Sequence, residues 1–453
     1  MGRPVKQLLD TWRRYWFAPT PLLDLAMTRI AIVGFQVWWI ARPPYRAALL
    51  GRTELPDALY DPLPILHALV SPMGWTFRPG SASLEIVLAL TIVAGLFGFI
   101  GLFTNVALLA FVLGCAFLQS FLYSFGDFHH PEALLIIALA LLALSPAGGA
   151  LSVDDLRRRF RRAREAGRFL DFDLKRSESV FAGWPLKLTG WVFVLIYASG
   201  AYFKLRNAGF DWANGYTLSY RMLEDALRWN ISLGEWLSAQ HVLMVGVSWM
   251  SLLFEAMFVL VMLAPVTRWV FVPLGATFHL GIYFTMGATF QGYVAAYSVF
   301  VPWRDVLERL ARRFGRPARR PAVMYDVTCP LCVRSVTFLR YWDWLERLEM
   351  KPLQEIERDG DLDPDALRRE MHVVFPDGSV ERGFFAFRRL LRELPPLWWL
   401  RPIFHLPGAG SLGPRVYTGV ARRRRRILCD GESCTIHDTP CLRTRTYVKG
   451  LLD

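Results

Sequence analysis

The stretch HVLMVGVSWMSLLFEAMFVLVMLA, residues 241–264, gives the clearest structural signal in the chain, and Glu255 is its only acidic residue. An apolar run of about 20 residues is long enough to cross the hydrocarbon core of a bilayer as a helix. Other runs of this character cover approximately residues 22–41, 84–103, 105–124, 131–147, 184–203, 268–286 and 288–303. The sequence therefore predicts a polytopic α-helical membrane bundle of about eight spans. The fourth and eighth runs are short enough to be broken or partly buried in protein.

The composition of the whole chain supports a membrane protein. Of its 453 residues, 53% are hydrophobic and 20% are charged, and 17 are Trp. This is too apolar for a set of soluble domains of the same length, and it excludes disordered and fibrous classes. The chain has 6 Cys, one in an apolar run and the others after residue 325. That placement does not favour an extracellular disulfide framework.

The distribution of charge predicts the orientation. The formal net charge is +13, from 52 Lys and Arg against 39 Asp and Glu. These basic residues flank the apolar runs instead of forming one basic soluble domain, so we expect no nucleic-acid partner. The positive-inside rule places the Arg-rich stretch 154–176 on the cytoplasmic side. With eight crossings both termini are cytoplasmic too, which predicts a multi-pass protein of the cell inner membrane with the lipid bilayer as a partner.

A few ionisable side chains lie inside the predicted spans. Each costs about 2.5–3.5 kcal/mol on insertion scales, so each needs a partner, a cavity or a function. Glu255 lies in mid-span and must be paired or protonated. Lys204 lies at a span end, where snorkelling to the interface alone would explain it. His279 by itself fits an ordinary hydrogen bond between helices.

Taken together, Lys204, Glu255 and His279 suggest an interior polar pocket in an aromatic-rich bundle, with His129 and His130 at the mouth of the fourth span. Such a pocket suits a flat apolar ligand with polar ends, such as a quinone. A buried lysine could act as a base toward a phenolic hydroxyl. We therefore take Lys204 as a candidate catalytic residue and the other four as candidate substrate-binding residues.

Three motifs in this region carry a family resemblance. They are Phe128-His-His-Pro-Glu132, Ile196-Tyr-Ala-Ser-Gly-Ala-Tyr-Phe-Lys-Leu205 and Phe278-His-Leu-Gly-Ile282. Together they resemble the HTTM transmembrane domain shared with vitamin K-dependent gamma-glutamyl carboxylase, over roughly residues 15–303. The large lumenal domain of the eukaryotic carboxylase has no counterpart after residue 303, so the acceptor and the reaction can differ.

The resemblance implies roles for particular residues. Lys204 matches the base that deprotonates the vitamin K hydroquinone in that carboxylase. His279, together with His130 or His129, would line the quinone pocket. The implied cofactor is a vitamin K-like quinone or hydroquinone.

The sequence changes character after the last span. A basic linker, residues 304–320, separates the membrane domain, residues 1–303, from a small domain at 321–428. There a short strand, Ala322-Val-Met-Tyr325, precedes Cys329-Pro-Leu-Cys332, which opens a helix. A strand-to-helix turn puts Cys329 at the helix N-terminus, where N–H groups and the helix dipole stabilise a thiolate. Cys332, one turn along, is placed to resolve a mixed disulfide.

The rest of this domain predicts its fold. Met371–Phe375, a Pro-Asp-Gly turn and Val380–Arg382 read as a hairpin, and Gly383 opens a further helix. This order predicts a small α/β thioredoxin-like domain. Tyr325-Asp-Val-Thr-Cys-Pro-Leu-Cys332 and His372-Val-Val-Phe-Pro-Asp-Gly378 closely resemble the DCC family of thiol-disulfide oxidoreductases. The resemblance implies exchange with a thiol or disulfide protein or with a small thiol.

A cysteine-containing tail, residues 429–453, ends the chain. A metal site formed by the C-x-x-C pair would recruit Cys429, Cys434, Cys441 or His437. Zinc sites favour a second closely spaced pair, so we expect no metal. For the tail cysteines themselves, a regulatory or relay dithiol, a metal loop and a structural role all remain open.

These observations favour a membrane-embedded, quinone-linked, vitamin K carboxylase-like redox enzyme fused to a cytosolic thiol-disulfide oxidoreductase. The alternative is an HTTM bundle that serves as a non-catalytic scaffold or as an export or maturation factor. In that case only the DCC domain is redox-active.

Overall fold

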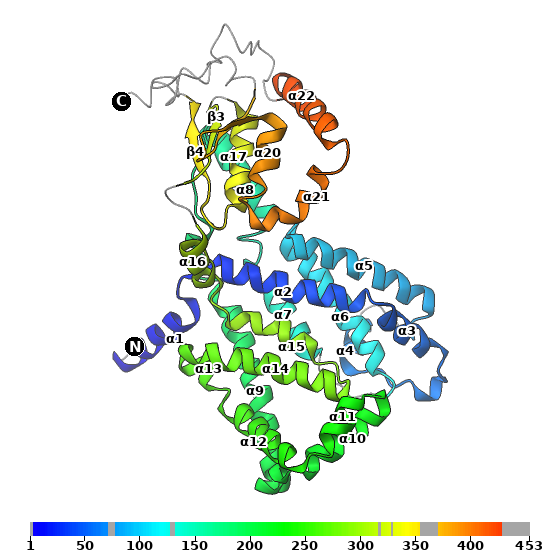
Figure 1. The fold of residues 1–453 in the computed structure, drawn as a ribbon. Coiled ribbons are helices and arrows are strands. Elements are labelled where there is room, and N and C mark those ends of the chain that lie inside the picture. Colours follow the sequence, from blue (N-terminus) through cyan, green and yellow to red (C-terminus); the bar gives the residue numbers. More distant parts are fainter. Residues whose placement is uncertain are drawn as a thin grey trace. The chain divides into compact units, whose positions relative to one another are not determined.

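The computed structural model describes residues 3–70, 78–126, 132–315, 319–327, 329–353 and 370–427. Contacts divide the chain into two units. The helical unit comprises Met1–Asp154 and Ser177–Trp303, and the C-terminal unit comprises Asp155–Arg176 and Arg304–Asp453. Most elements of both units are helices, and the larger sheet belongs to the C-terminal unit (Figure 1).

The helical unit is built from helices of very different length. They are α1 (Arg3–Phe17), α2 (Leu22–Ile40), α3 (Pro43–Gly51), α4 (Pro64–Val70), α5 (Ser81–Ile100), α6 (Thr104–Tyr123), α7 (Ala133–Ala143), α9 (Gly183–Ala208), α10 (Tyr216–Trp229), α11 (Ser232–Ser238), α12 (His241–Met257), α13 (Leu260–Leu263), α14 (Arg268–Met286) and α15 (Gln291–Ala296). Two short strands, β1 (Thr20–Pro21) and β2 (Glu178–Ser179), pair antiparallel. Two helices cross the unit boundaries, α8 (Val153–Ala166) and α16 (Trp303–Phe314).

Five helices within the described residues are long and apolar enough to cross a membrane. They are α2, α5, α6, α9 with the turn after it, and α14 with the turn before it, which agrees with five of the predicted runs. The count rises to six if α11 and α12, bent by 96°, form one span. The run 131–147 contains only the 11-residue α7, and 288–303 contains the six-residue α15. A membrane protein is therefore supported, whereas the count of eight spans is not confirmed.

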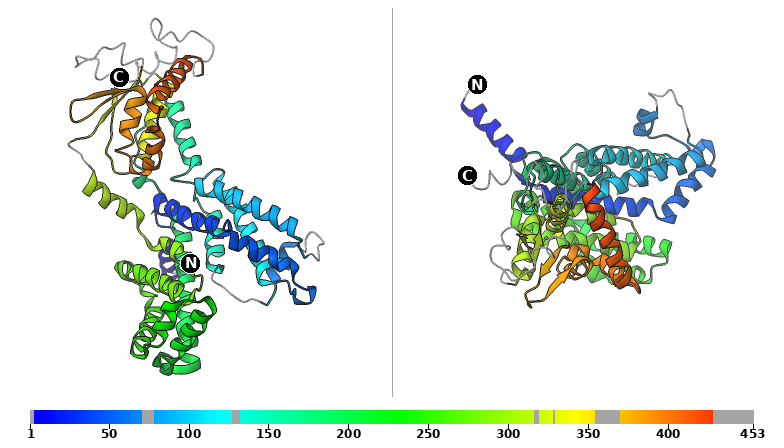
Figure 2. Two further views of the ribbon diagram at one scale, coloured as in Figure 1. Left: turned by 45° about the vertical axis from the view of Figure 1, so that its right-hand side comes forward. Right: turned by 90° about the horizontal axis from the view of Figure 1, so that it is seen from above.

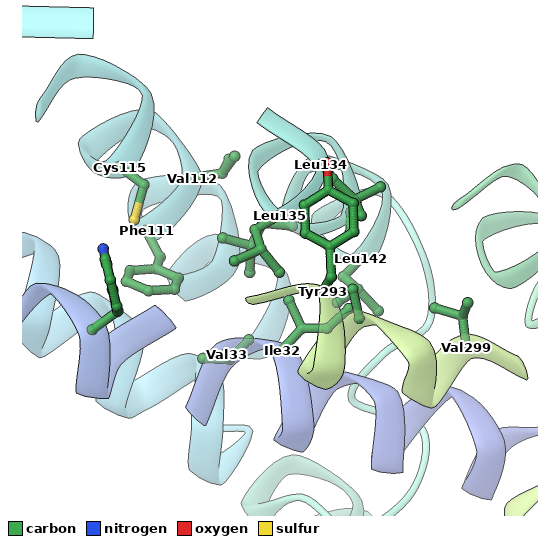
Figure 3. Packing of buried hydrophobic residues seen from close by; sticks show 14 of the residues in the cluster. Ile32, Val33, Phe111, Val112, Cys115, Leu134, Leu135, Leu142, Tyr293 and Val299 are labelled. Atoms are coloured by element: carbon green, nitrogen blue, oxygen red, sulfur yellow. The ribbon is translucent and has the colours of Figure 1, made fainter. Parts of the chain in front are cut away.

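The core of the helical unit surrounds α2. Ile32 and Val33 of α2 pack with Phe111 of α6 and Leu135 of α7, all fully or almost fully buried (Figure 3). Gly95 of α5 permits this packing, because a Cβ there would lie 2.5 Å from Val37 and 2.6 Å from Phe111. Small residues allow helices in a membrane to approach this closely.

The C-terminal unit contains a four-stranded sheet with helices around it (Figure 2). Its elements are β3 (Ala322–Tyr325), α17 (Pro330–Trp342), β4 (Glu349–Pro352), β5 (His372–Val374), β6 (Val380–Arg382), α20 (Gly383–Leu390), α21 (Arg401–Phe404) and α22 (Ala409–Ile427). The strand order is β4-β3-β5-β6; β3 runs parallel to β4 and antiparallel to β5, and β5 and β6 form a hairpin. Val323, Val336 and Val373 are fully buried in its core.

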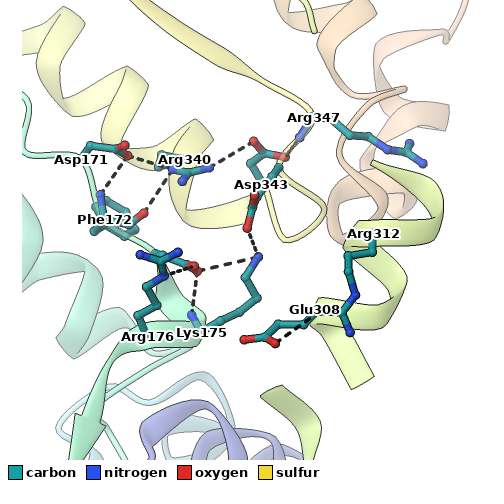
Figure 4. Close-up of polar contacts among 11 residues, drawn as sticks. Asp171, Phe172, Lys175, Arg176, Glu308, Arg312, Arg340, Asp343 and Arg347 are labelled. Carbon is teal, nitrogen blue, oxygen red and sulfur yellow. Dashed lines mark hydrogen bonds and ion pairs between the residues drawn. The ribbon is translucent and has the colours of Figure 1, made fainter. Parts of the chain in front are cut away.

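The Arg-rich segment Asp155–Arg176 belongs to this C-terminal unit. Arg340 of α17 is 2.9 Å from the carboxylate of Asp171 (Figure 4). Lys175 is paired with Glu346. Arg340 also donates to a backbone carbonyl of this segment at 3.1 Å. A stretch predicted only as a connecting loop therefore packs against the helix that carries the C-x-x-C pair.

Candidate functional site

The C-x-x-C pair lies where α17 begins. Cys329 is the N-cap of this helix with an extended backbone, and its Sγ accepts a hydrogen bond from the backbone N–H of Cys332 at 3.4 Å. Pro330 occupies the first helical position, where its fixed φ suits the helix and its missing N–H costs nothing. An N–H directed at sulfur favours the thiolate, which is the form that attacks disulfides. Both cysteines are partly buried.

The other end of α17 is fixed by a buried carboxylate. Asp343 is the C-cap, and its side chain is fully buried. It accepts backbone N–H bonds from Arg347 at 2.7 Å and Leu348 at 3.0 Å, and it lies 3.5 Å from the guanidinium of Arg340. Burial raises the pKa of Asp343, and these partners oppose that rise. The helix that presents the cysteines is thus anchored at both ends.

Cys332 also lines an apolar pocket of about 470 Å³. This volume lies within the range of about 300–1,000 Å³ that is typical of small-ligand sites. Helices α17, α20 and α22 each contribute to the wall, through Cys332, Ser335, Phe384, Phe387, Val416 and Val420. At the rim, the Tyr417 hydroxyl accepts the backbone N–H of Met371 at 2.9 Å and so ties α22 to the start of β5. The pocket therefore adjoins Cys332 of the thiol pair.

Sequence reasoning missed the α22 wall. Leu412, Val416 and Val420 follow one another at four-residue spacing, line the pocket, and are 61%, 57% and 52% exposed. The spacing itself was a usable signal, because apolar residues four apart lie on one face of a helix.

In the helical unit, Lys204 of α9 meets Glu255 of α12. The Lys204 ammonium donates to Glu255 Oε1 at 2.6 Å and lies 3.5 Å from the Ser251 hydroxyl. It also lies 4.3 Å from the centre of the Trp212 ring, a cation–π distance. Lys204 is thus paired inside the unit, and Glu255 has the partner that its position in mid-span demanded.

His279 of α14 belongs to a second polar group. The Tyr197 hydroxyl is hydrogen-bonded to His279 Nε2 at 2.7 Å and to the Tyr297 hydroxyl. Tyr197 lies two helical turns from Lys204 on the same face of α9, about 10 Å along the axis. His279 and the Lys204–Glu255 pair are thus both joined to α9, at positions two turns apart, and no direct bond between them is found in the described part of the chain.

Two buried atoms of these groups lack a hydrogen-bond partner among the described residues. They are Glu255 Oε2 and His279 Nδ1. Buried polar atoms without a hydrogen-bond partner are uncommon in proteins, so a bound water or ligand is a natural partner for each of these two atoms. His129 and His130, the remaining predicted pocket residues, lie outside the described residues.

A metal site at the cysteine pair is the alternative to redox chemistry there. Within the described ranges, no group of three or more His, Cys, Asp and Glu is arranged to hold a metal ion. The tail residues that such a site would recruit, Cys429, Cys434, His437 and Cys441, lie outside those ranges.

Comparison with known proteins defines the class of the C-terminal domain. Residues 323–430 match the family model of DCC1-like thiol-disulfide oxidoreductases. The chain is also 30% identical over 115 residues to an uncharacterized chloroplastic protein of Arabidopsis thaliana. That alignment covers 23% of this chain and 51% of the relative, so the chain spans about half the length of the curated relative it matches. No solved structure matches the chain.

Residues 323–430 thus form a DCC1-like thiol-disulfide oxidoreductase domain, which supports an oxidoreductase activity there. The family match begins at residue 323. It gives no support to the HTTM resemblance or to the vitamin K carboxylase activity that the sequence suggested for the helical unit.

Proposed function

We propose that the protein is a membrane-bound thiol-disulfide oxidoreductase with Cys329 as nucleophile and Cys332 as resolving cysteine. The observation that carries the proposal is the hydrogen bond from the Cys332 N–H to Cys329 Sγ at the start of α17. The Cys329 thiolate attacks a substrate disulfide and releases one thiolate of the substrate. Cys332 then attacks Cys329 Sγ, which forms the Cys329–Cys332 disulfide and frees the second substrate thiol. The reverse sequence oxidises a dithiol.

A thioredoxin-like fold is part of this proposal. Its support is the strand order β4-β3-β5-β6 with β3 and β4 parallel, the C-x-x-C helix directly after the central β3, and α20 directly after β6. A parallel pair needs a crossover, and α17 supplies it between β3 and β4. The cysteines consequently lie at one end of the central strand.

We propose the cytoplasmic side of the inner membrane for this domain, with both chain termini on that side. Nine Lys and Arg lie in residues 154–176, and residues 155–176 pack within the C-terminal unit. The two must lie on the same side of the membrane, and the positive-inside rule favours the cytoplasm for the segment. The thiol partner is then a cytosolic protein or a small thiol.

The test is turnover of a peptide disulfide by the full-length protein in detergent. Wild type should reduce the peptide with dithiothreitol as electron donor, and Cys329→Ser should not. Cys115→Ala is the matched control, because Cys115 is buried in α6, outside the site. Equal rates for all three proteins would contradict the proposal.

A second candidate function concerns the helical unit. We propose that Lys204, Glu255 and His279 line a site for an apolar ligand with polar ends, such as a quinone or hydroquinone. The support is the pair of orphaned atoms, Glu255 Oε2 and His279 Nδ1, since a ligand hydroxyl would donate to the carboxylate oxygen and a ligand hydroxyl or carbonyl would bond to the ring nitrogen. The ion pair limits the role of Lys204 as a base, because a paired ammonium must first pass its proton to Glu255.

Mass spectrometry of lipid and quinone co-purified with the protein tests this site. The expected result is a bound quinone in wild type, lost in His279→Ala and kept in Thr277→Ala, a control on an exposed position of the same helix. A wild-type protein free of quinone would favour the scaffold alternative, in which Lys204 and Glu255 only join α9 to α12.

A further inference from the structure

The pocket beside Cys332 has a volume of about 470 Å³ and is lined mostly by apolar side chains. Its α22 wall presents Leu412, Val416 and Val420, each more than half exposed. Open apolar surface of this kind marks a site that something covers. The same helix is followed in the sequence by the C-terminal tail, which begins at Cys429, two residues beyond Ile427.

The tail contains cysteines that could bind in the pocket beside Cys332. Of the 6 Cys in the chain, two form the C-x-x-C pair, one is buried in α6, and the other three are Cys429, Cys434 and Cys441. Ile436 and Leu442 supply apolar side chains close to Cys434 and Cys441. A thiol flanked by an apolar side chain suits a pocket with apolar walls and one cysteine.

We propose that the pocket receives the tail around Cys434, and that Cys434 and Cys441 form a second dithiol that exchanges with Cys329 and Cys332. This inference rests on the proposed thiol-disulfide function and names its first exchange partner, which is the chain itself. Tethering makes the exchange intramolecular, at an effective concentration in the millimolar range for a short flexible linker.

The reach of the chain selects among the tail cysteines. Helix α22 runs seven residues past Val420, about 10 Å of helix. To return to the pocket, the chain beyond Ile427 must cover at least that distance. Cys429 is two residues beyond Ile427, about 7 Å of extended chain, whereas Cys434 is seven residues beyond it, about 23 Å. The chain between Ile427 and Cys434 or Cys441 is therefore long enough to reach the pocket, whereas the chain between Ile427 and Cys429 is too short.

The exchange balances without any other reagent. With the pair oxidised, the Cys434 thiolate attacks Cys329 Sγ, which breaks the Cys329–Cys332 bond and forms a Cys329–Cys434 disulfide. Cys441 then attacks Cys434 Sγ, so that the tail becomes a disulfide and Cys329 leaves as a thiolate. Two electrons pass from tail to pair, and the two protons lost by the tail thiols are regained by Cys329 and Cys332.

The experiment uses the full-length chain with Cys332→Ser and Cys441→Ser, which leaves neither resolving thiol. After equilibration in a glutathione redox buffer and alkylation, peptide mass mapping identifies the partner of Cys329. We expect the Cys329–Cys434 link to exceed the Cys329–Cys429 link by about tenfold or more. Adding Val416→Arg should fill the pocket and lower the Cys329–Cys434 yield by about tenfold, whereas Thr418→Arg, exposed on α22 outside the pocket, should leave it unchanged.

The partner found on Cys329 distinguishes failure of the tail proposal from failure of the proposed function. Cys329 bound mainly to glutathione, to Cys429 or to another protein would overturn the tail proposal, while peptide turnover by wild type would keep the proposed function intact. Equal yields of the Cys329–Cys434 disulfide with Val416→Arg and Thr418→Arg would show that the pocket does not bind the tail. A Cys329 that takes no disulfide partner at all would overturn both proposals.

Discussion

The helical unit and the C-terminal unit place their exceptional groups in opposite surroundings. In the helical unit, Lys204 and Glu255 are charged groups paired among apolar helices. In the C-terminal unit, Leu412 and Val416 are apolar groups left open beside a thiol. A charge within a span and an open apolar face each cost free energy, so both arrangements indicate function. The helical unit is therefore probed best by measurements of stability, and the C-terminal unit by measurements of thiol reactivity.

The largest effect should separate the two cysteines of the pair. Cys329→Ser removes the nucleophile and should lower peptide-disulfide turnover by about 100-fold or more. Cys332→Ser keeps the nucleophile and should instead accumulate mixed disulfides on Cys329, detectable by non-reducing mass spectrometry. If Cys329→Ser accumulated the adducts and Cys332→Ser did not, the two roles would be reversed.

The next effect tests the charge pair of the helical unit. Glu255→Leu leaves the Lys204 ammonium without its carboxylate, and breaking a buried pair costs about 3 kcal/mol. Unfolding of detergent-solubilised protein by SDS measures this loss. The double variant Lys204→Met/Glu255→Leu should recover much of it, because no charge then remains. The single variant Lys204→Met completes the comparison. If the loss of stability in the double variant equalled the sum of the losses in the two single variants, the two groups would not interact.

A smaller effect concerns Asp343 and depends on pH. Asp343→Asn removes one of two acceptor oxygens and should cost about 1 kcal/mol near neutral pH. Because burial raises the folded pKa of Asp343 above its ordinary value of 3.8, the folded state holds the proton more tightly than the unfolded state. The contribution of this group to stability therefore falls as pH rises through that window. Acidification should stabilise wild type relative to Asp343→Asn in thermal unfolding, and the opposite slope would contradict the assigned burial.

The smallest effect should come from Glu346. Its bond to Lys175 lowers its pKa, so its stabilising contribution is present above the ordinary value of 4.5 and is lost as pH falls through the lower folded value. The Glu346 side chain is 37% exposed, which limits the cost of Glu346→Gln to about 0.5 kcal/mol. Thermal unfolding at neutral pH should resolve this small loss. A loss as large as that of Glu255→Leu would contradict the expectation that solvent exposure weakens the Lys175–Glu346 pair.

The sequence predicted well what local pattern determines. The strand before Cys329, the helix that begins at Pro330 and the hairpin around Gly378 all follow from neighbouring residues, and all are present. The long apolar helices follow from composition alone. The break after Met257 could not be predicted, because neither Pro nor Gly marks it and the apolar run continues to Ala264.

Long-range contacts explain the remaining differences. Residues 155–176 pack with the C-terminal unit through pairs such as Asp171–Arg340, which are 169 residues apart. The α22 wall of the pocket depends on where a helix more than 75 residues after Cys332 folds back. Pairing of Lys204 with Glu255 was foreseen only as a need of Glu255 for some partner, since nothing local says which helices meet.

The most direct test of the central claim is a glutathione redox titration of the full-length protein, read by alkylation and peptide mass mapping. We expect Cys329 and Cys332 to become resistant to alkylation together, in one two-electron transition that forms a Cys329–Cys332 disulfide, while buried Cys115 takes no part. Two thiols that stay alkylatable across the whole titration, or that react only after zinc is chelated, would contradict it.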